Sequence, residues 1–380
     1  MKNVVIAGYH RSPFTLAYKG QLVRIRPDDL TAQVVKALIH KTSVNPDEIE
    51  DLILGCGFPE GEQGFNAARL VVHLAGLPTS VAGTTINRFC GSSMQSIHCA
   101  AGAIQMGAGE VFVCAGVESM TRVPMGGFNP MPNPVLYQSF PQAYIGMGET
   151  AENLADKYQI SRSEQEIFSL KSHKKAVEAQ QAGRFSEEIV PIDVPKTGVV
   201  DQDGCIRPDS NAESLAGLKP AFRETGSVTA GTSSPLTDGA AAVLVCSEDY
   251  ANTNNLKSLA RIKSIAVSAC APEIMGIGPV NASRKALQRA ELDLDDIDIV
   301  ELNEAFAAQS LAVLKDLPIP EEKLNIDGGA IALGHPLGAT GARITGKAAS
   351  LLQRENKRYA LATQCIGGGQ GIATILERVS

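Results

Sequence analysis

The stretch Lys36–Leu54, which reads KALIHKTSVNPDEIEDLIL, carries the pattern on which the fold prediction rests. Its first part has the apolar spacing of an amphipathic helix, its middle is an acidic turn, and Leu52–Leu54 is a short buried strand. The same order returns in Lys285–Val300, KALQRAELDLDDIDIV. Two copies of one helix–turn–strand unit indicate that the chain contains a duplicated subdomain.

The two copies continue alike, each with a helical stretch, a further segment, a loop, a helix and a strand. These parts are expected at 66–74, 81–87, Cys90, 92–106 and 111–115 in the first copy, and at 305–314, 323–327, His335, 341–353 and 359–363 in the second. Alternating helices and apolar strands predict an α/β core with both sheet faces covered. We therefore expect Cys90 and His335 in matching loops, each after a strand and before a helix, converging near one point.

Between the copies the sequence changes character. The segment 121–142 is proline-rich and irregular, 163–184 has a helical pattern, 189–209 is mostly loop, and a buried strand returns at 240–246. We predict a twofold α/β core overlaid by an inserted loop lobe. The expected boundaries are 1–118 with 233–254 for the N-terminal half, 119–232 for the lobe, and 255–380 for the C-terminal half.

Composition excludes several classes of protein. The 380 residues include 34 basic and 41 acidic side chains, a net charge of −7, which argues against a nucleic-acid-binding surface. No apolar stretch approaches the roughly 18 residues of a membrane span. The apolar run Val4–Gly8 is too short for a secretory signal and predicts a first buried strand, so we expect a cytoplasmic protein.

The cysteines point to chemistry rather than to cross-links. Eight cysteines in 380 residues are too few for a disulfide scaffold. They form no CxxC pair, and no two histidines have ligand spacing on a helix, so no metal site is expected.

Cys90 and His335 are the first candidates for catalysis. A thiol beside an imidazole is the minimum for an activated cysteine nucleophile. Cys90 also precedes a predicted helix, whose N-terminal dipole favours thiolate, and Gly91 with the two serines after it is expected to leave room for a substrate carbonyl. A buried cysteine at a tight turn, and a helix-entry turn around His335, are the structural alternatives.

Two further clusters follow predicted strands. Cys365 ends one strand and opens the run Gly367–Gly369, whose backbone N–H groups suit an oxyanion. A simple strand-to-strand turn is the alternative. Asn303 and Glu304 follow the strand at 299–302, where an α/β sheet presents groups to its ligand. Helix capping by Asn303 is the alternative there.

At these clusters the chain resembles the thiolase family over essentially its whole length. The resemblance rests on the long stretches GEQGFNAAR (61–69), VTAGTSSPLTDGAAA (228–242) and GGAIALGHPLGATGARI (328–344). Within the family it is nearest to the bacterial 3-ketoacyl-CoA thiolases of fatty-acid oxidation. The resemblance implies a duplicated core of two similar mixed sheets in αβαβα layers. It also implies CoA-dependent retro-Claisen cleavage of 3-ketoacyl-CoA.

The resemblance assigns roles residue by residue. Cys90 would carry the acyl group as a thioester, and His335 would deprotonate it and then, with a water held by Asn303, bind a thioester oxygen. Cys365 would move the proton at the alpha carbon of acetyl-CoA, and the amides of Cys90 and Gly367 would form a second oxyanion hole. The implied CoA-site residues are Met147, Arg207, Ser214, Ser234, Ala305 and Phe306. CoA and acyl-CoA are substrates, so no cofactor or metal is implied.

Other members of the family, and other classes, remain as alternatives. Biosynthetic acetoacetyl-CoA thiolases commonly place His before the loop methionine, and this chain has Gly146 before Met147, which favours the degradative enzyme. A decarboxylating ketoacyl synthase is disfavoured because Cys365 stands where those enzymes use His. A non-catalytic acyl-CoA or lipid carrier is the alternative from a different class.

The resemblance also suggests partners. We expect a homodimer or homotetramer, and a complex with a hydratase/dehydrogenase subunit of β-oxidation. The lobe at Met125–Tyr144 is expected to bind acyl chains or a partner subunit, with an ordinary covering loop as the alternative.

Overall fold

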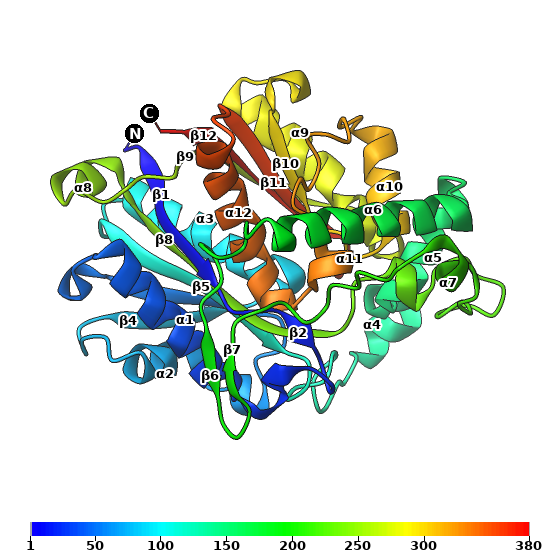
Figure 1. The fold of residues 1–380 in the computed structure, drawn as a ribbon, viewed down its shortest axis with the longest axis horizontal. Coiled ribbons are helices and arrows are strands. Elements are labelled where there is room, and N and C mark those ends of the chain that lie inside the picture. The colour runs from blue at the N-terminus through cyan, green and yellow to red at the C-terminus, as the bar shows by residue number, and fades with distance from the viewer. Residues whose placement is uncertain (1, 380) are drawn as a thin grey trace.

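The computed structural model describes residues 2–379 as alternating helices and strands (Figure 1). The N-terminal half contains β1 (Val4–Arg11), β2 (Thr15–Leu16), α1 (Pro27–Thr42), β3 (Asp51–Cys56), α2 (Ala67–Leu74), β4 (Ala82–Ile86), α3 (Ser92–Gln105), β5 (Val111–Ser119) and β8 (Thr237–Ser247). The C-terminal half contains β9 (Ala260–Ala269), α9 (Gly278–Ala290), β10 (Ile299–Leu302), α10 (Ala307–Asp316), α11 (Ala330–Leu333), α12 (Leu337–Arg354), β11 (Tyr359–Ile366) and β12 (Gln370–Arg378).

The remaining elements lie in the insertion and in the connection between the halves. The insertion contains α4 (Pro134–Ser139), α5 (Met147–Lys157), α6 (Arg162–Gln181), β6 (Ile192–Val194), β7 (Gly198–Val200) and α7 (Ala212–Ala216), and α8 (Glu248–Thr253) connects the halves. Strands β6 and β7 form a separate two-stranded hairpin. No helix within residues 2–379 is long and apolar enough to cross a membrane.

The sheet shows the duplication directly. Its strand order is β4-β3-β5-β8-β1 in the first half and β10-β11-β12-β9 in the second, and the halves meet where β1 pairs with β9. The parallel pairs β3–β5 and β10–β11 are each followed by two antiparallel pairs, and the first half has one further parallel pair, β4–β3, at its edge. The same order with the same strand directions confirms the predicted duplicated α/β core.

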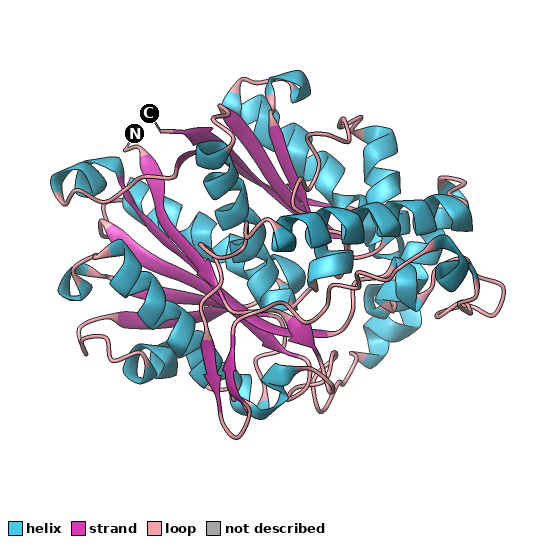
Figure 2. Ribbon diagram, viewed as in Figure 1, coloured by secondary structure: helices cyan, strands magenta, loops and turns pink. Residues whose placement is uncertain are grey.

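Helices lie outside and between the two halves of the sheet (Figure 2). α1 and α2 pack on one face of the N-terminal half, and α9 covers the outer face of the C-terminal half with α10 against it. α3 and α12 lie between and contact strands of both halves. This is the predicted αβαβα arrangement. It explains why β8 is buried along its whole length, because helices cover both of its faces.

The two central helices touch at their N-terminal turns. A Cβ on Gly341 would lie 2.3 Å from the backbone nitrogen of Met94, so only glycine permits this approach. The amide of Ala342 donates to Oγ of Ser93 at 2.8 Å across the same contact. The loops that precede α3 and α12 are therefore brought together, as the repeat predicted. Only the Cys90 loop follows a strand, however, because the short helix α11 directly precedes His335.

One predicted strand is almost absent. The strand expected at 323–327 is reduced to a single parallel bridge between Leu324 and Val300. The Asn325 side chain replaces the next rung, because its Oδ1 accepts from the Leu302 amide and its Nδ2 donates to the Leu302 carbonyl, both at 2.9 Å. The residue boundaries of the three-part division remain a prediction.

Candidate active site

Cys90 lies in a single 3-10 turn, Phe89–Gly91, directly before α3. Phe89 has a φ of 42°, a left-handed conformation that few non-glycine residues adopt. The hydroxyl of Ser92 fixes the turn by donating to the Phe89 carbonyl at 2.6 Å and accepting from the Arg88 amide at 2.9 Å. The Gln364 side chain on β11 donates to the Cys90 carbonyl, so both halves of the fold position this turn.

The glycine and serines after Cys90 do not leave space for substrate, and this prediction is wrong. A Cβ on Gly91 would lie 2.5 Å from Cδ1 of Ile366, so a core side chain already fills that position. Ser92 holds the turn, and Ser93 accepts from α12. Their small size serves the packing of α3 against β11 and α12.

The ionisation of Cys90 also differs from the prediction. The residue is 8% exposed. This burial raises the pKa of its thiol to about 11, although the backbone N–H groups of Gly367 and of Cys90 itself, which lie near the sulfur, act to lower it. Burial thus outweighs the donors at the helix N-terminus, and the resting residue is a thiol that needs a base. The second oxyanion hole, formed by the amides of Cys90 and Gly367, remains a prediction.

Hydrogen bonds fix the tautomer of the His335 imidazole. Its Nδ1 lies 2.6 Å from Oγ1 of Thr340, which itself donates to the Pro336 carbonyl at 3.0 Å and so accepts from the ring. The proton of the neutral ring is therefore on Nδ1, and the Nε2 lone pair faces Nδ2 of Asn303 at 3.4 Å. Burial, with help from the Arg343 charge, lowers the pKa of His335 to about 3, so the ring is neutral near pH 7.

Asn303 and Glu304 have different surroundings. The amide of Asn303 donates to the Thr363 carbonyl at 3.0 Å, and its buried Oδ1 has no hydrogen-bond partner within residues 2–379. Because α10 begins at Ala307 with Phe306 as its N-cap, Asn303 does not cap that helix.

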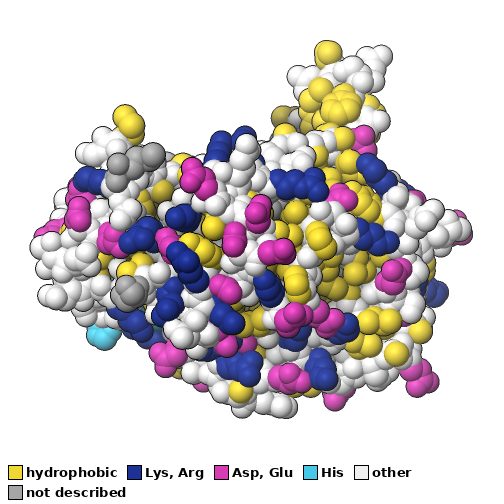
Figure 3. Space-filling model, turned by 90° about the horizontal axis from the view of Figure 1, so that it is seen from above, with side chains coloured by type: hydrophobic (Ala, Val, Ile, Leu, Met, Phe, Trp, Pro, Cys, Tyr) yellow, Lys and Arg dark blue, Asp and Glu magenta, His cyan; other side chains and the backbone are white. Residues whose placement is uncertain are grey.

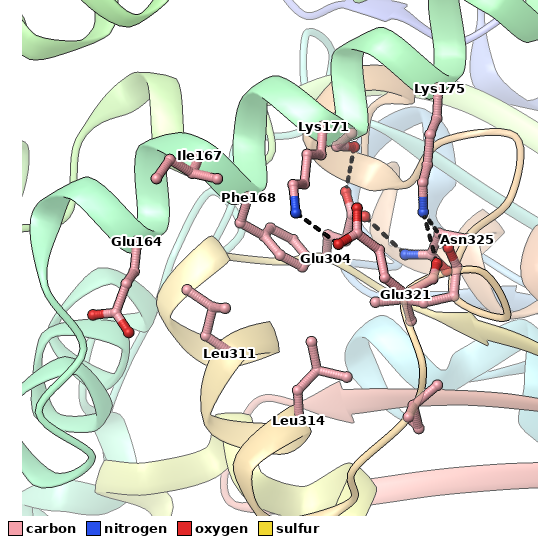
Figure 4. Close-up of a pocket in the computed structure, with 13 residues that line it drawn as sticks. Glu164, Ile167, Phe168, Lys171, Lys175, Glu304, Leu311, Leu314, Glu321 and Asn325 are labelled. Carbon is pink, nitrogen blue, oxygen red and sulfur yellow. Dashed lines mark hydrogen bonds and ion pairs between the residues drawn. The ribbon is translucent and has the colours of Figure 1, made fainter.

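Glu304 holds neighbouring segments together. Its carboxylate accepts from Ser172 Oγ at 2.6 Å and from Asn325 Nδ2 at 2.8 Å (Figure 4). It also accepts from the Ile331 amide at 3.2 Å. The cavity of about 240 Å³ in Figure 4 lies between α6 and α10 beside this carboxylate, and Cys90 does not line it. Glu304 therefore joins α6 to the loop before α11.

Cys365 and Gly367 complete the group around Cys90. Burial raises the pKa of the Cys365 thiol well above its usual value, and the nearby Cys90 sulfur adds to the shift. Gly367 begins the turn to β12, in which Gly368 and Gly369 have φ of 78° and 82°. The turn is thus a strand connection, and it also brings an amide to Cys90.

Four of the six predicted CoA-site residues gather beside Cys365. Ala305 and Phe306 share a buried apolar cluster with it, and the half-buried Met147 packs against that cluster. The Ser234 amide donates to the Ala305 carbonyl at 3.0 Å.

Arg207 and Ser214 lie elsewhere, exposed on the insertion. The Arg207 amide donates to His173 Nδ1 at 3.2 Å, and Ser214 caps α7 with Asn211. Within residues 2–379, no hydrogen bond or ion pair joins either to the Cys90 group.

Comparison with known protein families identifies the family of this chain. Residues 4–249 match the thiolase N-terminal domain, and residues 256–378 match the thiolase C-terminal domain. The chain belongs to the thiolase family. It is 45% identical to the 3-ketoacyl-CoA thiolase of Bacillus subtilis over 99% of this chain and 100% of that protein. It is 48% identical to the 3-ketoacyl-CoA thiolase of Idiomarina loihiensis over 100% of both.

Solved thiolase-family structures superpose closely. Acetyl-CoA acetyltransferase of Bacillus anthracis has a TM-score of 0.93 and 41% identity, covering 100% of this chain and 99% of that one. Human mitochondrial 3-ketoacyl-CoA thiolase in complex with CoA has a TM-score of 0.92 and 39% identity, covering 100% of this chain and 98% of that one. These two proteins are named for different activities, although they share one fold.

Sequence reasoning missed three residues of this thiolase-family site. Thr340 fixes the His335 tautomer, and Gln364 fixes the Cys90 turn. Glu118 is fully buried, and its carboxylate accepts from the amides of Gly57 at 2.8 Å and Gly338 at 2.9 Å. It thereby ties β5 to the first turn of α12. Its place at the carboxyl end of a buried strand was the available signal.

Within residues 2–379 no group of three His, Cys, Asp or Glu side chains is arranged to hold a metal ion. The predictions of no metal and no cofactor remain predictions.

Proposed function

We propose that this thiolase-family chain is a degradative 3-ketoacyl-CoA thiolase, which uses CoA to cleave 3-ketoacyl-CoA into acetyl-CoA and a shortened acyl-CoA. One observation carries the proposal. The Cys90 thiol lies near the backbone N–H groups of Gly367 and of Cys90 itself and beside a second thiol, Cys365, while a neutral His335 faces Asn303. Nucleophile, base, second acid/base and oxyanion donors are the set that retro-Claisen cleavage needs.

The first half-reaction uses both thiols. Nε2 of His335 accepts the Cys90 proton, and the thiolate attacks the C3 ketone of the substrate. The amides of Cys90 and Gly367 stabilise the resulting oxyanion. The C2–C3 bond then breaks, its electron pair goes to C2 as the acetyl-CoA enolate, and Cys365 protonates C2. His335 and a water on Asn303 would bind the enolate oxygen.

The second half-reaction releases the acyl group. Cys365, now a thiolate, accepts the proton of a CoA thiol, and the CoA sulfur attacks the Cys90 thioester. The carbonyl re-forms as Cys90 leaves, and its sulfur recovers a proton from His335. Acetyl-CoA departs before CoA binds, so the kinetics are ping-pong.

The degradative subtype rests on Gly146, which stands before Met147. Relatives at 45% and 48% identity carry the 3-ketoacyl-CoA thiolase name, while one similar structure is titled acetyl-CoA acetyltransferase. Biosynthetic acetoacetyl-CoA thiolase is therefore the second candidate, and a non-catalytic carrier is the third.

A series of 3-ketoacyl-CoA substrates from C4 to C10 separates the three candidates. We expect kcat/KM for C10 to equal or exceed that for C4, because a degradative site must accept long chains. An enzyme active on C4 alone would support the biosynthetic reading. A chain that binds acyl-CoA without CoA-dependent cleavage of any length would be a carrier.

The assembly proposals have separate support. Strand β4 pairs only with β3 among residues 2–379, so one edge of the sheet is open, and Phe65 nearby is 95% exposed. Both features favour a homo-oligomer, a homodimer or homotetramer. Light scattering is expected to give two or four times the single-chain mass, and a monomer at micromolar concentration would contradict this.

The composition of the segment Met125–Tyr144 within the lobe favours a role in binding a partner. It contains no charged residue, and Met131 and Val135 are among its exposed side chains. We propose that it contacts acyl chains or a hydratase/dehydrogenase subunit, in a protein located in the cytoplasm.

A further inference from the structure

A groove of about 860 Å³ follows the junction between the two halves, away from Cys90. We call it the seam groove. Its lining comes from β1, the end of α1 at 41–42, the insertion segment 183–188, the connector at 257–259 and the second half of α12. This volume is within the range of small-molecule sites, about 300–1,000 Å³. Both halves of the fold and the insertion therefore contribute to the lining of the groove.

The charge of the seam groove is opposite to that of the chain. Basic and acidic side chains are interspersed on the face seen in Figure 3. The lining of the groove instead has five cations, Lys41, Arg184, Lys257, Lys347 and Arg354, against two carboxylates, Glu187 and Glu188. The whole chain carries −7. Because Arg184, Lys347 and Arg354 are paired with carboxylates, the positive charge open to an anionic ligand comes from Lys41 and Lys257.

The cations fall into two groups. Lys347 is nearly buried and bridges Glu188 at 2.9 Å and Asp327 at 2.8 Å, and Arg354 and Arg184 also reach Asp327. Lys41 and Lys257 are exposed and have no ion-pair partner within residues 2–379. The ion pairs hold the first group in place. The ammonium groups of Lys41 and Lys257 remain available to a ligand.

Uncharged lining residues suit an organic body. Ser350 faces the groove, and its hydroxyl has no hydrogen-bond partner within residues 2–379. Leu259 and Tyr9 add apolar surface beside it. Inorganic phosphate would fill only a small part of this volume.

We propose that the seam groove binds a small organic molecule carrying two or more phosphate charges, with its phosphates on Lys41 and Lys257. Ammonium groups bind phosphate oxygens as point charges, and both lysines line the same groove. The ligand would contact both halves and the insertion at once. This site goes beyond the proposed thiolysis and does not depend on it.

ADP, adenosine and inorganic pyrophosphate are the probes, measured by calorimetry on the full chain at about 50 mM salt. We expect saturable binding of ADP, with adenosine and pyrophosphate each weaker by at least about tenfold. The double variant Lys41→Glu/Lys257→Glu should weaken ADP by at least about tenfold and leave thiolysis unchanged. The control Lys36→Glu/Lys357→Glu makes the same charge change outside the groove and should alter ADP affinity less than about twofold.

Three results would overturn the proposal. The first is no saturation up to about 5 mM ADP. The second is ADP binding that the groove variant does not weaken, which would place the nucleotide in the CoA site. The third is pyrophosphate binding as tightly as ADP, which would mean that the groove does not recognise an organic body.

Discussion

Replacing Cys90 with alanine is expected to lower kcat/KM for thiolysis by at least about 10⁴-fold and to abolish the acyl-enzyme. In the proposed reaction no other thiol takes its place, because the backbone N–H groups of Gly367 and Cys90 lie near the Cys90 sulfur. The neighbouring thiol, Cys365, carries a proton in that reaction. Intact-protein mass spectrometry after mixing with acyl-CoA should show one acyl adduct on the wild type and none on the variant.

Cys99→Ala is the matched control. Cys99 lies on the same helix, α3, and its side chain is exposed and free. We expect this variant to keep its activity and its acyl adduct. Cleavage by Cys90→Ala within about tenfold of the wild type, or an adduct mapped to Cys99, would exclude Cys90 as the nucleophile.

The second large effect concerns stability. Asp327→Asn is expected to lower the free energy of unfolding by about 3–5 kcal/mol. The Asp327 carboxylate is fully buried and accepts from Lys347 at 2.8 Å and from Arg354 at 2.5 Å. An amide cannot balance these charges, and Lys347 has little access to solvent. Urea unfolding followed by circular dichroism measures the change.

Glu355→Gln is the control for this substitution. Glu355 also pairs with Arg354, at 2.7 Å, but its side chain is 39% exposed. Exposed ion pairs contribute about 0–1 kcal/mol, so little should change. Equal losses in the two variants would contradict a special role for the buried network.

The same carboxylate gives a pH dependence with a definite sign. Burial alone would raise the pKa of Asp327, but the hydrogen bond from Arg354 and the charge of Lys347 bring it down to about 2. The folded carboxyl thus binds its proton less readily than the unfolded one, at a pKa of about 3.9. Its contribution, about 2 kcal/mol, is complete above about pH 5 and is lost as pH falls towards 2. Asp327→Asn should remove this part of the acid sensitivity.

Much of the fold followed from local sequence patterns. The repeated helix–turn–strand unit predicted the duplicated core, because each copy has the same apolar period and the same turn. The prediction failed at 323–327, where the Asn325 side chain takes over the pairing with Leu302 that a strand backbone would provide. Such a substitution of side chain for backbone has no periodic signal.

For the site, the positions of the main loops were predictable from the sequence, but the surroundings of the side chains were not. The repeat placed Cys90 and His335 in matching loops before α3 and α12, and in the structure the Gly367 amide lies near the Cys90 sulfur. The ionisation of Cys90 was not predictable, because it depends on how completely distant segments bury the thiol. Glu118 was missed for a similar reason, since its partner Gly338 is distant in sequence. The roles assigned to the site residues remain predictions.

The way the two halves are joined has a consequence for how such a site could arise. They share one sheet through only two residue pairs, Val5–Arg261 and Ile6–Ala260, while their equivalent helices cross at the site. Two identical separate copies in this arrangement would have to present the same residue from both loops. Covalent fusion removes that requirement, so one loop can specialise as the nucleophile and its counterpart as the base. The difference between Cys90 and His335 at matching loops is therefore one that two identical copies could not show.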